Sequence, residues 1–199
     1  MKLLTFFLLI LFSFSAYSKT ILFLGDSLTE GYGVGVENSF PTVFTNLAKK
    51  AGFDDLKIVN GGVSGSTTAS GLKRLKWFLR SKPDTLFLAL GANDGLRGVD
   101  LKKSKQNLLE IIKTAKSKSI EVVLAGMQLP PNYGIKYTYQ FKKMFVDIAR
   151  DQKIKLYPFL LEGVAGKKNL NLPDGIHPNS QGHEVIGKKV FEFLKGNLK

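Results

Sequence analysis

The stretch Thr20-Ile-Leu-Phe-Leu-Gly-Asp-Ser-Leu-Thr-Glu-Gly-Tyr-Gly33 decides how the rest of the chain is interpreted. Its first half, Thr20 to Leu24, is a short apolar run typical of a strand that is buried on both faces. The run stops at Gly25-Asp26-Ser27, so a small polar turn follows the strand directly. In open α/β sheets, ligands bind at the carboxyl ends of the strands. Ser27 is therefore a candidate nucleophile, and it needs partners from later in the chain.

Apolar runs of strand length alternate with helical spacing over the rest of the chain. Further strands are predicted at 56–59, 85–90, 120–125 and 154–157. Apolar residues recur at helical spacing within about 40–51, 67–79, 108–115, 137–148 and 186–194. This alternation favours right-handed crossovers between parallel strands. We predict an α/β fold of one domain: a three-layer α/β/α sandwich whose five-stranded, mostly parallel sheet has flavodoxin-like order.

The first residues form a pattern typical of a secretory signal. Met1-Lys2 is positively charged, Leu3 to Phe14 is apolar, and Ala16-Tyr17-Ser18 has small residues at both positions that a signal peptidase reads. A membrane anchor is the alternative, but the apolar run is short for a bilayer and the first strand follows within a few residues. The sequence therefore predicts a signal peptide over 1–18, a mature domain over 19–199, and a periplasmic or secreted protein.

Composition narrows the classes of partner. The formal net charge is +13, and 25 of the 29 basic residues are lysine. Nucleic-acid readers favour arginine, so a solvated lysine-rich surface is the simpler interpretation, with weak attraction to anionic membrane surfaces second. Cysteine is absent, and the two histidines are too few for a ligand set. We expect no nucleic acid, no metal and no cofactor, and a monomeric protein.

Polar residues follow several of the predicted strands. Ser27 follows the first strand, Gly65 the second and Asn93 the third, and Asp174 and His177 lie in the loop after the fifth. The carboxyl ends of parallel strands meet at one edge of a sheet, so these residues are expected to lie close together.

These residue types suit nucleophilic catalysis. A serine hydroxyl needs a base, and an imidazole such as that of His177 titrates near neutral pH. Asp174, three residues earlier, can hold the ring in the required tautomer. A tetrahedral intermediate also needs hydrogen-bond donors, which a glycine-rich turn and the carboxamide of Asn93 can supply.

The same residues resemble a known family. Gly25-Asp26-Ser27-Leu28 resembles block I of the GDSL, or SGNH, hydrolases, and Gly65, Asn93 and His177 match the residues of blocks II, III and V. All four blocks occur in order over essentially the whole mature chain. The strings 90–98 and 129–134 resemble the secreted arylesterase/thioesterase I/lysophospholipase subgroup of that family.

The resemblance implies roles and an activity. It implies a Ser27–His177–Asp174 triad and an oxyanion hole formed by the N–H groups of Ser27 and Gly65 and the Asn93 side chain. It implies a serine esterase for acyl esters or lysophospholipids, with thioesterase capacity. A carbohydrate O-acetyl esterase is the enzymatic alternative. A non-catalytic flavodoxin-like binding module is the alternative from another class.

The remaining polar and apolar candidates are open to two interpretations. Leu96, Val99, Leu129 and Tyr133 are predicted to line an apolar acyl groove, with ordinary loop positions as the equal alternative. Asp26 is expected to anchor its turn through backbone hydrogen bonds, and Asp94 is expected to be a turn former. His183 falls inside the last helix, where a surface or hydrogen-bonding role is expected.

Overall fold

The computed structural model describes residues 18–198. In this part of the chain five parallel strands form one sheet in the order β2-β1-β3-β4-β5. This confirms the predicted flavodoxin-like order. The strands are β1 (Thr20–Gly25), β2 (Lys57–Gly62), β3 (Thr85–Ala89), β4 (Glu121–Ala125) and β5 (Lys155–Tyr157).

The central strands are buried because helices cover both faces of the sheet. Every residue of β1 and β3 is buried, as expected for apolar runs in a parallel sheet. The ring of Phe23 packs against Phe40, Phe44 and Phe87 with ring centroids 5.2 to 5.4 Å apart. This aromatic cluster joins the centre of the sheet to the first long helix and fixes the position of β1.

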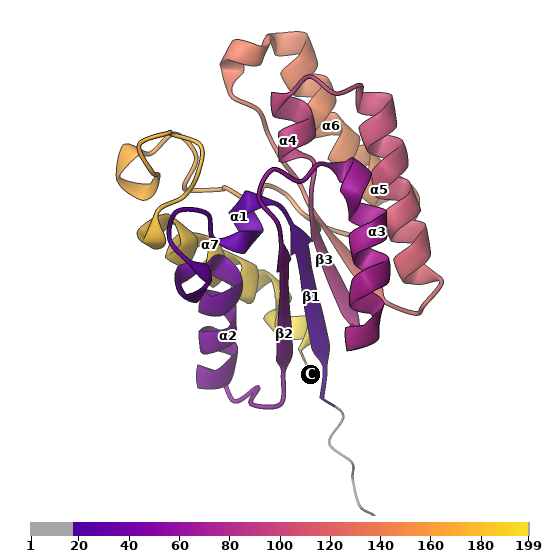
Figure 1. Cartoon of the computed structure of the whole chain (residues 1–199), viewed down its shortest axis with the longest axis vertical. Coiled ribbons are helices and arrows are strands. Elements are labelled where there is room, and N and C mark those ends of the chain that lie inside the picture. Colours follow the sequence, from indigo (N-terminus) through magenta and orange to yellow (C-terminus); the bar gives the residue numbers. More distant parts are fainter. Residues whose placement is uncertain (1–17, 199) are drawn as a thin grey trace, which may run out of the picture.

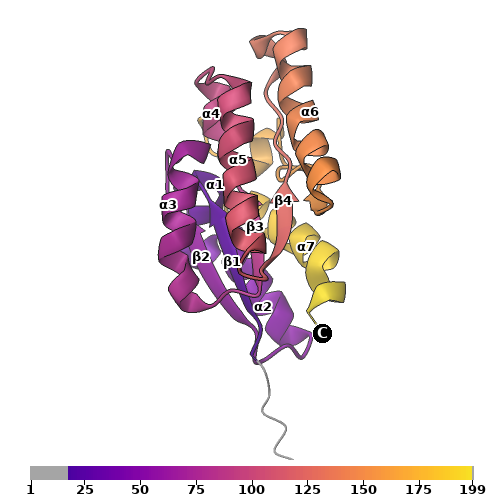
Figure 2. The ribbon, with the colours of Figure 1, turned by 90° about the vertical axis from the view of Figure 1, so that its right-hand side faces the viewer.

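Within residues 18–198, five long helices complete the three layers. Two of them pack on one face of the sheet and three on the other, and the two groups lie on opposite sides of the strands in Figure 1 and in the turned view of Figure 2. The first group is α2 (Phe40–Lys50) and α7 (Ser180–Leu194). The second group is α3 (Thr68–Phe78), α5 (Leu101–Lys116) and α6 (Ile135–Gln152).

Two short helices begin where polar turns were expected. They are α1 (Ser27–Glu30) and α4 (Ala92–Leu96), directly after β1 and β3. The Asp26 side chain caps α1 by accepting the N–H of Leu28 at 3.0 Å, which confirms its predicted turn-anchoring role. Single turns of 3₁₀ helix also occur at Val36–Asn38, Leu79–Ser81, Pro131–Tyr133, Lys168–Leu170 and Lys195–Asn197.

The predicted signal peptide lies outside the described residues except for Ser18. Among residues 18–198, no helix has the length and apolar character needed to span a bilayer.

Candidate active site

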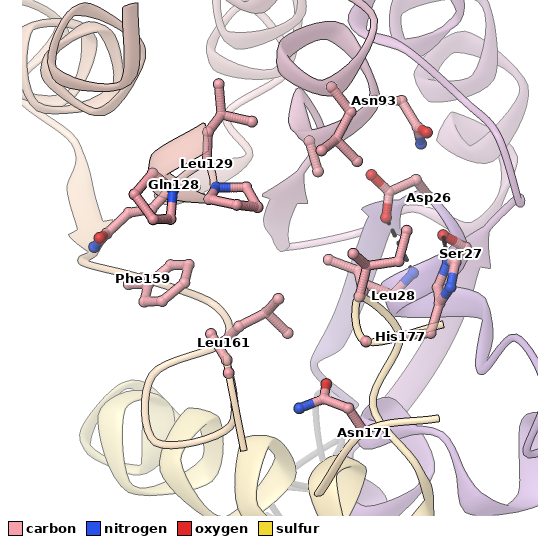
Figure 3. Close-up of a pocket in the computed structure, with 18 residues that line it drawn as sticks. Asp26, Ser27, Leu28, Asn93, Gln128, Leu129, Phe159, Leu161, Asn171 and His177 are labelled. Carbon is pink, nitrogen blue, oxygen red and sulfur yellow. Dashed lines mark hydrogen bonds between the residues drawn. The ribbon is translucent and has the colours of Figure 1, made fainter. Parts of the chain in front are cut away.

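The predicted site residues meet at the carboxyl edge of the sheet. Ser27 is the first residue of α1 after β1, and Asn93 lies in α4 after β3. Asp174 and His177 belong to the long segment between β5 and α7. Figure 3 shows Ser27, Asn93 and His177 bordering one cavity, each contributed by a different segment. The sheet topology therefore brings together residues that are up to 150 positions apart.

Ser27, His177 and Asp174 form a continuous hydrogen-bonded chain. The Oγ of Ser27 lies 2.9 Å from Nε2 of His177, and Nδ1 of His177 lies 2.7 Å from Oδ2 of Asp174. Ser27 is buried, whereas the Asp174 side chain is 38% exposed at the rim. The ring of Tyr32 lies against the His177 imidazole, with centroids 4.6 Å apart. The arrangement has the geometry that nucleophile, base and orienting carboxylate require.

A tight turn fixes Asp174 and His177 relative to each other. Oδ1 of Asp174 accepts the N–H groups of Ile176 and His177, each at 3.0 Å, and leaves Oδ2 for the imidazole. Desolvation would raise the pKa of Asp174, but the hydrogen bonds from the His177 backbone and ring and from Ile176 outweigh it and hold this pKa below its ordinary value. Asp174 is therefore a carboxylate at neutral pH, as an orienting group must be.

Three candidate hydrogen-bond donors belong to the segments that follow β1, β2 and β3. Asn93 borders the cavity and donates one Nδ2 hydrogen to the Ser66 carbonyl at 3.0 Å, which leaves the second Nδ2 hydrogen available. Within residues 18–198, the backbone N–H groups of Ser27 and Gly65 have no intramolecular acceptor. Gly65 has a φ of 73°, a left-handed conformation that favours glycine. Unused donors of this kind can bind a developing oxyanion.

Asp94 is a buried anchor, so the prediction of a simple turn former is wrong. Its side chain is 1% exposed and accepts three hydrogen bonds: from the N–H of Thr68 at 2.9 Å, from the Thr68 hydroxyl at 2.5 Å and from the Ser104 hydroxyl at 3.1 Å. It ties α4 to α3 and α5, and this fixes the orientation of the neighbouring Asn93.

An apolar cavity of about 450 Å³ opens beside Ser27 (Figure 3). Leu96 and Leu129 line it as predicted. Val99 and Tyr133 do not, and this corrects the prediction for these two positions. The Tyr133 hydroxyl instead donates to the Leu96 carbonyl at 3.2 Å, so Tyr133 supports the α4 segment from behind. Val99 lies past the end of α4, where its N–H donates to the Asp94 carbonyl at 2.9 Å.

Much of the cavity wall comes from a segment that residue patterns did not single out. Phe159, Leu161 and Ala165 follow β5 and contribute apolar surface opposite Leu129, as Figure 3 shows for the two larger residues. This segment has no regular apolar spacing, so nothing in the chain order indicated its approach to Ser27. The position of β5 next to β4 brings it there.

Asp26 carries a buried carboxyl beside the nucleophile. It is fully buried, and its Oδ2 has no hydrogen-bond partner within the described residues. Desolvation raises the pKa of Asp26 to about 6, against the opposing effects of the Leu28 N–H, His177 and Arg74. This carboxyl therefore titrates well above the ordinary aspartate value of 3.8.

We expect Asp26→Asn to make the unfolding free energy less dependent on pH. A carboxyl whose pKa rises on folding binds its proton more tightly in the folded state. Its contribution to stability is full below about pH 4 and is lost as the pH rises through about 6, a change of about 3 kcal/mol. Asparagine keeps an oxygen for the Leu28 N–H but cannot ionise. Relative to wild type, the variant should gain about that amount between acid and neutral pH.

Urea unfolding of both proteins at about pH 4 and about pH 8 measures this difference. The second histidine, His183, is buried and accepts the Phe40 N–H at 3.2 Å, as its predicted hydrogen-bonding role requires. Its desolvation lowers its pKa to about 4, so its own contribution is lost as the pH falls, but it is common to both proteins and cancels. An equal difference between the two proteins at both pH values would contradict the assignment.

No cluster of three or more histidine, cysteine, aspartate or glutamate side chains suited to a metal ion occurs within residues 18–198.

The chain is similar in sequence and structure to proteins of one hydrolase family. Residues 23–185 match the GDSL-like Lipase/Acylhydrolase family. An arylesterase of Vibrio mimicus is 37% identical over 185 residues, which cover 92% of each chain. The thioesterase 1/protease 1/lysophospholipase L1 of Escherichia coli (strain K12) is 34% identical over 194 residues, covering 96% of this chain and 91% of that protein. A crystal structure of TesA has a TM-score of 0.86 and 35% identity, covering 91% of this chain and 100% of that chain.

These findings confirm the resemblance that the four sequence blocks indicated. The matched region runs from β1 into α7, so it includes all the polar turns at the carboxyl edge. The similar proteins carry the names of esterases and thioesterases. The chain therefore belongs to the GDSL-like lipase/acylhydrolase family, and it is a carboxylic ester hydrolase.

Proposed function

We propose that this protein hydrolyses acyl esters through a covalent acyl-enzyme on Ser27, with His177 as the general base and Asp174 as its orienting carboxylate. The observation that carries the proposal is the hydrogen-bonded chain from Ser27 Oγ to His177 Nε2 at 2.9 Å and from His177 Nδ1 to Asp174 at 2.7 Å. A hydroxyl within this distance of an imidazole can lose its proton as it attacks.

The proposed reaction has two steps. Ser27 Oγ attacks the ester carbonyl carbon while its proton passes to His177 Nε2, and the carbonyl oxygen becomes an oxyanion. The tetrahedral intermediate collapses, and the leaving alkoxide, aryloxide or thiolate takes the proton from His177. Water then attacks the acyl-enzyme with His177 again as base, which releases the carboxylic acid and restores the Ser27 hydroxyl.

The proposed oxyanion hole consists of the N–H groups of Ser27 and Gly65 and the free Nδ2 hydrogen of Asn93. Support comes from the lack of an intramolecular acceptor for both backbone groups within residues 18–198 and from the Asn93 bond to Ser66, which fixes the carboxamide. Fixed donors stabilise the transition state without reorganisation during the reaction.

The proposed substrates carry an acyl chain that the apolar cavity can bury. Leu96, Leu129, Phe159 and Leu161 supply the apolar lining, and about 450 Å³ is within the range of small-molecule sites. The names of the similar proteins, arylesterase and thioesterase/lysophospholipase, support aryl esters, thioesters and lysophospholipids as substrate classes.

We further propose that the enzyme is exported and monomeric, and the signal-like pattern of residues 1–18 supports the export.

A panel of esters with one leaving group and increasing acyl length tests this function. We expect kcat/KM to rise from acetyl to longer chains by up to about fourfold per methylene, since each buried methylene contributes about 0.8 kcal/mol, and to level off once the cavity is filled. Steady-state hydrolysis by the mature chain, residues 19–199, measures this slope. A preference for acetyl esters would instead favour the carbohydrate O-acetyl esterase.

A matched variant ties the acyl preference to the cavity. Leu161→Asn keeps the branched shape and the number of side-chain heavy atoms but replaces apolar surface with a smaller, polar amide. It should lower kcat/KM for the longest acyl esters by about tenfold and leave acetyl ester turnover within about twofold of wild type. An equal loss for all chain lengths would contradict the assignment of Leu161 to the acyl groove.

A further inference from the structure

A carboxylate from α1 holds the turn that carries Gly65. Oε2 of Glu30 accepts the backbone N–H of Ser64 at 2.7 Å and also accepts the Ser64 hydroxyl. Glu30 is the last residue of α1, the helix that Ser27 begins. Ser64 directly precedes Gly65, the proposed backbone donor to the oxyanion. One side chain therefore connects the segment of the nucleophile to the segment of this donor.

The two segments also approach each other closely through their backbones. A Cβ atom at Gly62 would lie 2.2 Å from the backbone nitrogen of Glu30, so only glycine permits this contact. The Asn60 side chain donates to the Thr29 carbonyl at 3.0 Å. These contacts hold the end of β2 against α1, but they stop before the turn. Beyond them, Glu30 is the side chain that reaches Ser64.

The other hydrogen bonds of the turn lie at its ends, on Val63 and Ser66. Val63, Ser64 and Gly65 are exposed. The Val63 N–H donates to the Gly25 carbonyl at 3.3 Å, the Ser66 N–H donates to the Val63 carbonyl at 3.2 Å, and the Asn93 side chain donates to the Ser66 carbonyl at 3.0 Å, but none of these bonds involves Ser64 or Gly65. Exposed segments with few contacts open at low free-energy cost. Hydrogen bonds to a carboxylate are stronger than those between neutral groups. The Glu30 bonds are therefore a main restraint on the direction of the Gly65 N–H.

We propose that Glu30 is a positioning residue for ester hydrolysis, which acts by fixing the Ser64–Gly65 turn so that the Gly65 N–H points to the oxyanion. This inference rests on the proposed function of Gly65. Glu30 does not line the cavity beside Ser27, and Ser64 is exposed, so water can replace the lost bonds in a variant. Loss of the carboxylate therefore changes the geometry of the site that binds the transition state and leaves folding unaffected.

The experiment compares Glu30→Ala and Glu30→Gln with the exposed control Glu37→Ala in the mature enzyme. Removing an oxyanion donor entirely costs about 10²–10³ in kcat, and a misdirected donor should cost part of this, about tenfold. We expect Glu30→Ala to lower kcat about tenfold with KM unchanged. Inhibition constants for a trifluoromethyl ketone, whose tetrahedral adduct occupies the oxyanion hole, should rise by the same factor. Glu30→Gln retains an acceptor oxygen and should restore most of the activity.

The outcomes separate this inference from the proposed function. Wild-type kcat and inhibitor binding in Glu30→Ala would overturn the positioning role, as would a loss that accompanies a lowered thermal midpoint or an equal loss in Glu37→Ala. Asn93→Ala serves as the reference. If trifluoromethyl ketone binding responds to Asn93→Ala but not to Glu30→Ala, only the role of Glu30 fails. If it responds to neither variant, the proposed oxyanion hole itself is wrong.

Discussion

Ser27→Ala is expected to lower kcat for ester hydrolysis by about 10⁵–10⁶-fold, because loss of the nucleophile in a serine hydrolase removes the covalent route entirely. Residual turnover would come from oxyanion stabilisation and binding alone. The substitution deletes one oxygen from a nearly buried side chain whose hydroxyl faces His177 at 2.9 Å. Folding should therefore be preserved, and KM should change little.

Kinetics and covalent labelling check this expectation together. A fluorophosphonate should add one phosphonyl group to Ser27 in the folded wild-type protein, as read by peptide mass spectrometry, and none to Ser27→Ala. Ser117→Ala is the matched control, since Ser117 lies at the end of α5 and bonds only locally to the Thr114 carbonyl at 2.8 Å. Substantial ester hydrolysis by Ser27→Ala, or a phosphonate adduct on another residue, would refute the nucleophile assignment.

Asn93→Ala has the second largest expected effect. Loss of one oxyanion donor in a comparable hydrolase lowers kcat by about 10²–10³-fold, or roughly 2.7–4 kcal/mol of transition-state stabilisation. The same range is expected here because the Asn93 carboxamide borders the cavity beside Ser27 and has one Nδ2 hydrogen free. KM should remain close to that of wild type, since the interaction forms in the transition state.

The Asn93 variant also loses its bond to the Ser66 carbonyl, so its folding must be tested separately. Thermal unfolding and the rate of fluorophosphonate labelling of Ser27 distinguish the two effects. A variant that unfolds at the wild-type temperature, but whose Ser27 is labelled more slowly than in wild type, fits the oxyanion role. Wild-type turnover would rule that role out, and a large drop in the thermal midpoint would assign the defect to structure.

Local residue patterns were sufficient for the fold and for the meeting of Ser27, His177 and Asp174. The apolar run of β1 and its abrupt end at Asp26-Ser27 predicted a buried strand with a hydroxyl at its end, and the structure has both. Asp174 and His177 are three residues apart, so a single turn brings them together and spacing alone indicated the pair. The alternation of strands and helices, together with the chirality of crossovers, then predicted that these turns share one edge.

Patterns failed where contacts are long-range and irregular. Asp94 was expected to form a turn, but Thr68 and Ser104 from two other helices make it a buried anchor. Tyr133 was expected in the groove, but its hydroxyl bonds to the back of the Leu96 segment. In both cases packing against distant segments, which the neighbouring residues in the sequence do not indicate, decided which way the side chain faced.

The division follows from the range of the forces involved. Period-two and period-3.6 burial, caps and tight turns depend on neighbours within a few residues, so they can be read along the chain. The apolar cavity beside Ser27 depends on how the segment after β5 crosses the sheet edge opposite α4. The Glu30 bond to Ser64 spans 34 positions and exists because β1 and β2 are neighbours in the sheet. The types of the proposed catalytic residues were thus decided by sequence, whereas the shape of the apolar cavity and the contact between Glu30 and the Ser64–Gly65 turn were decided by tertiary packing.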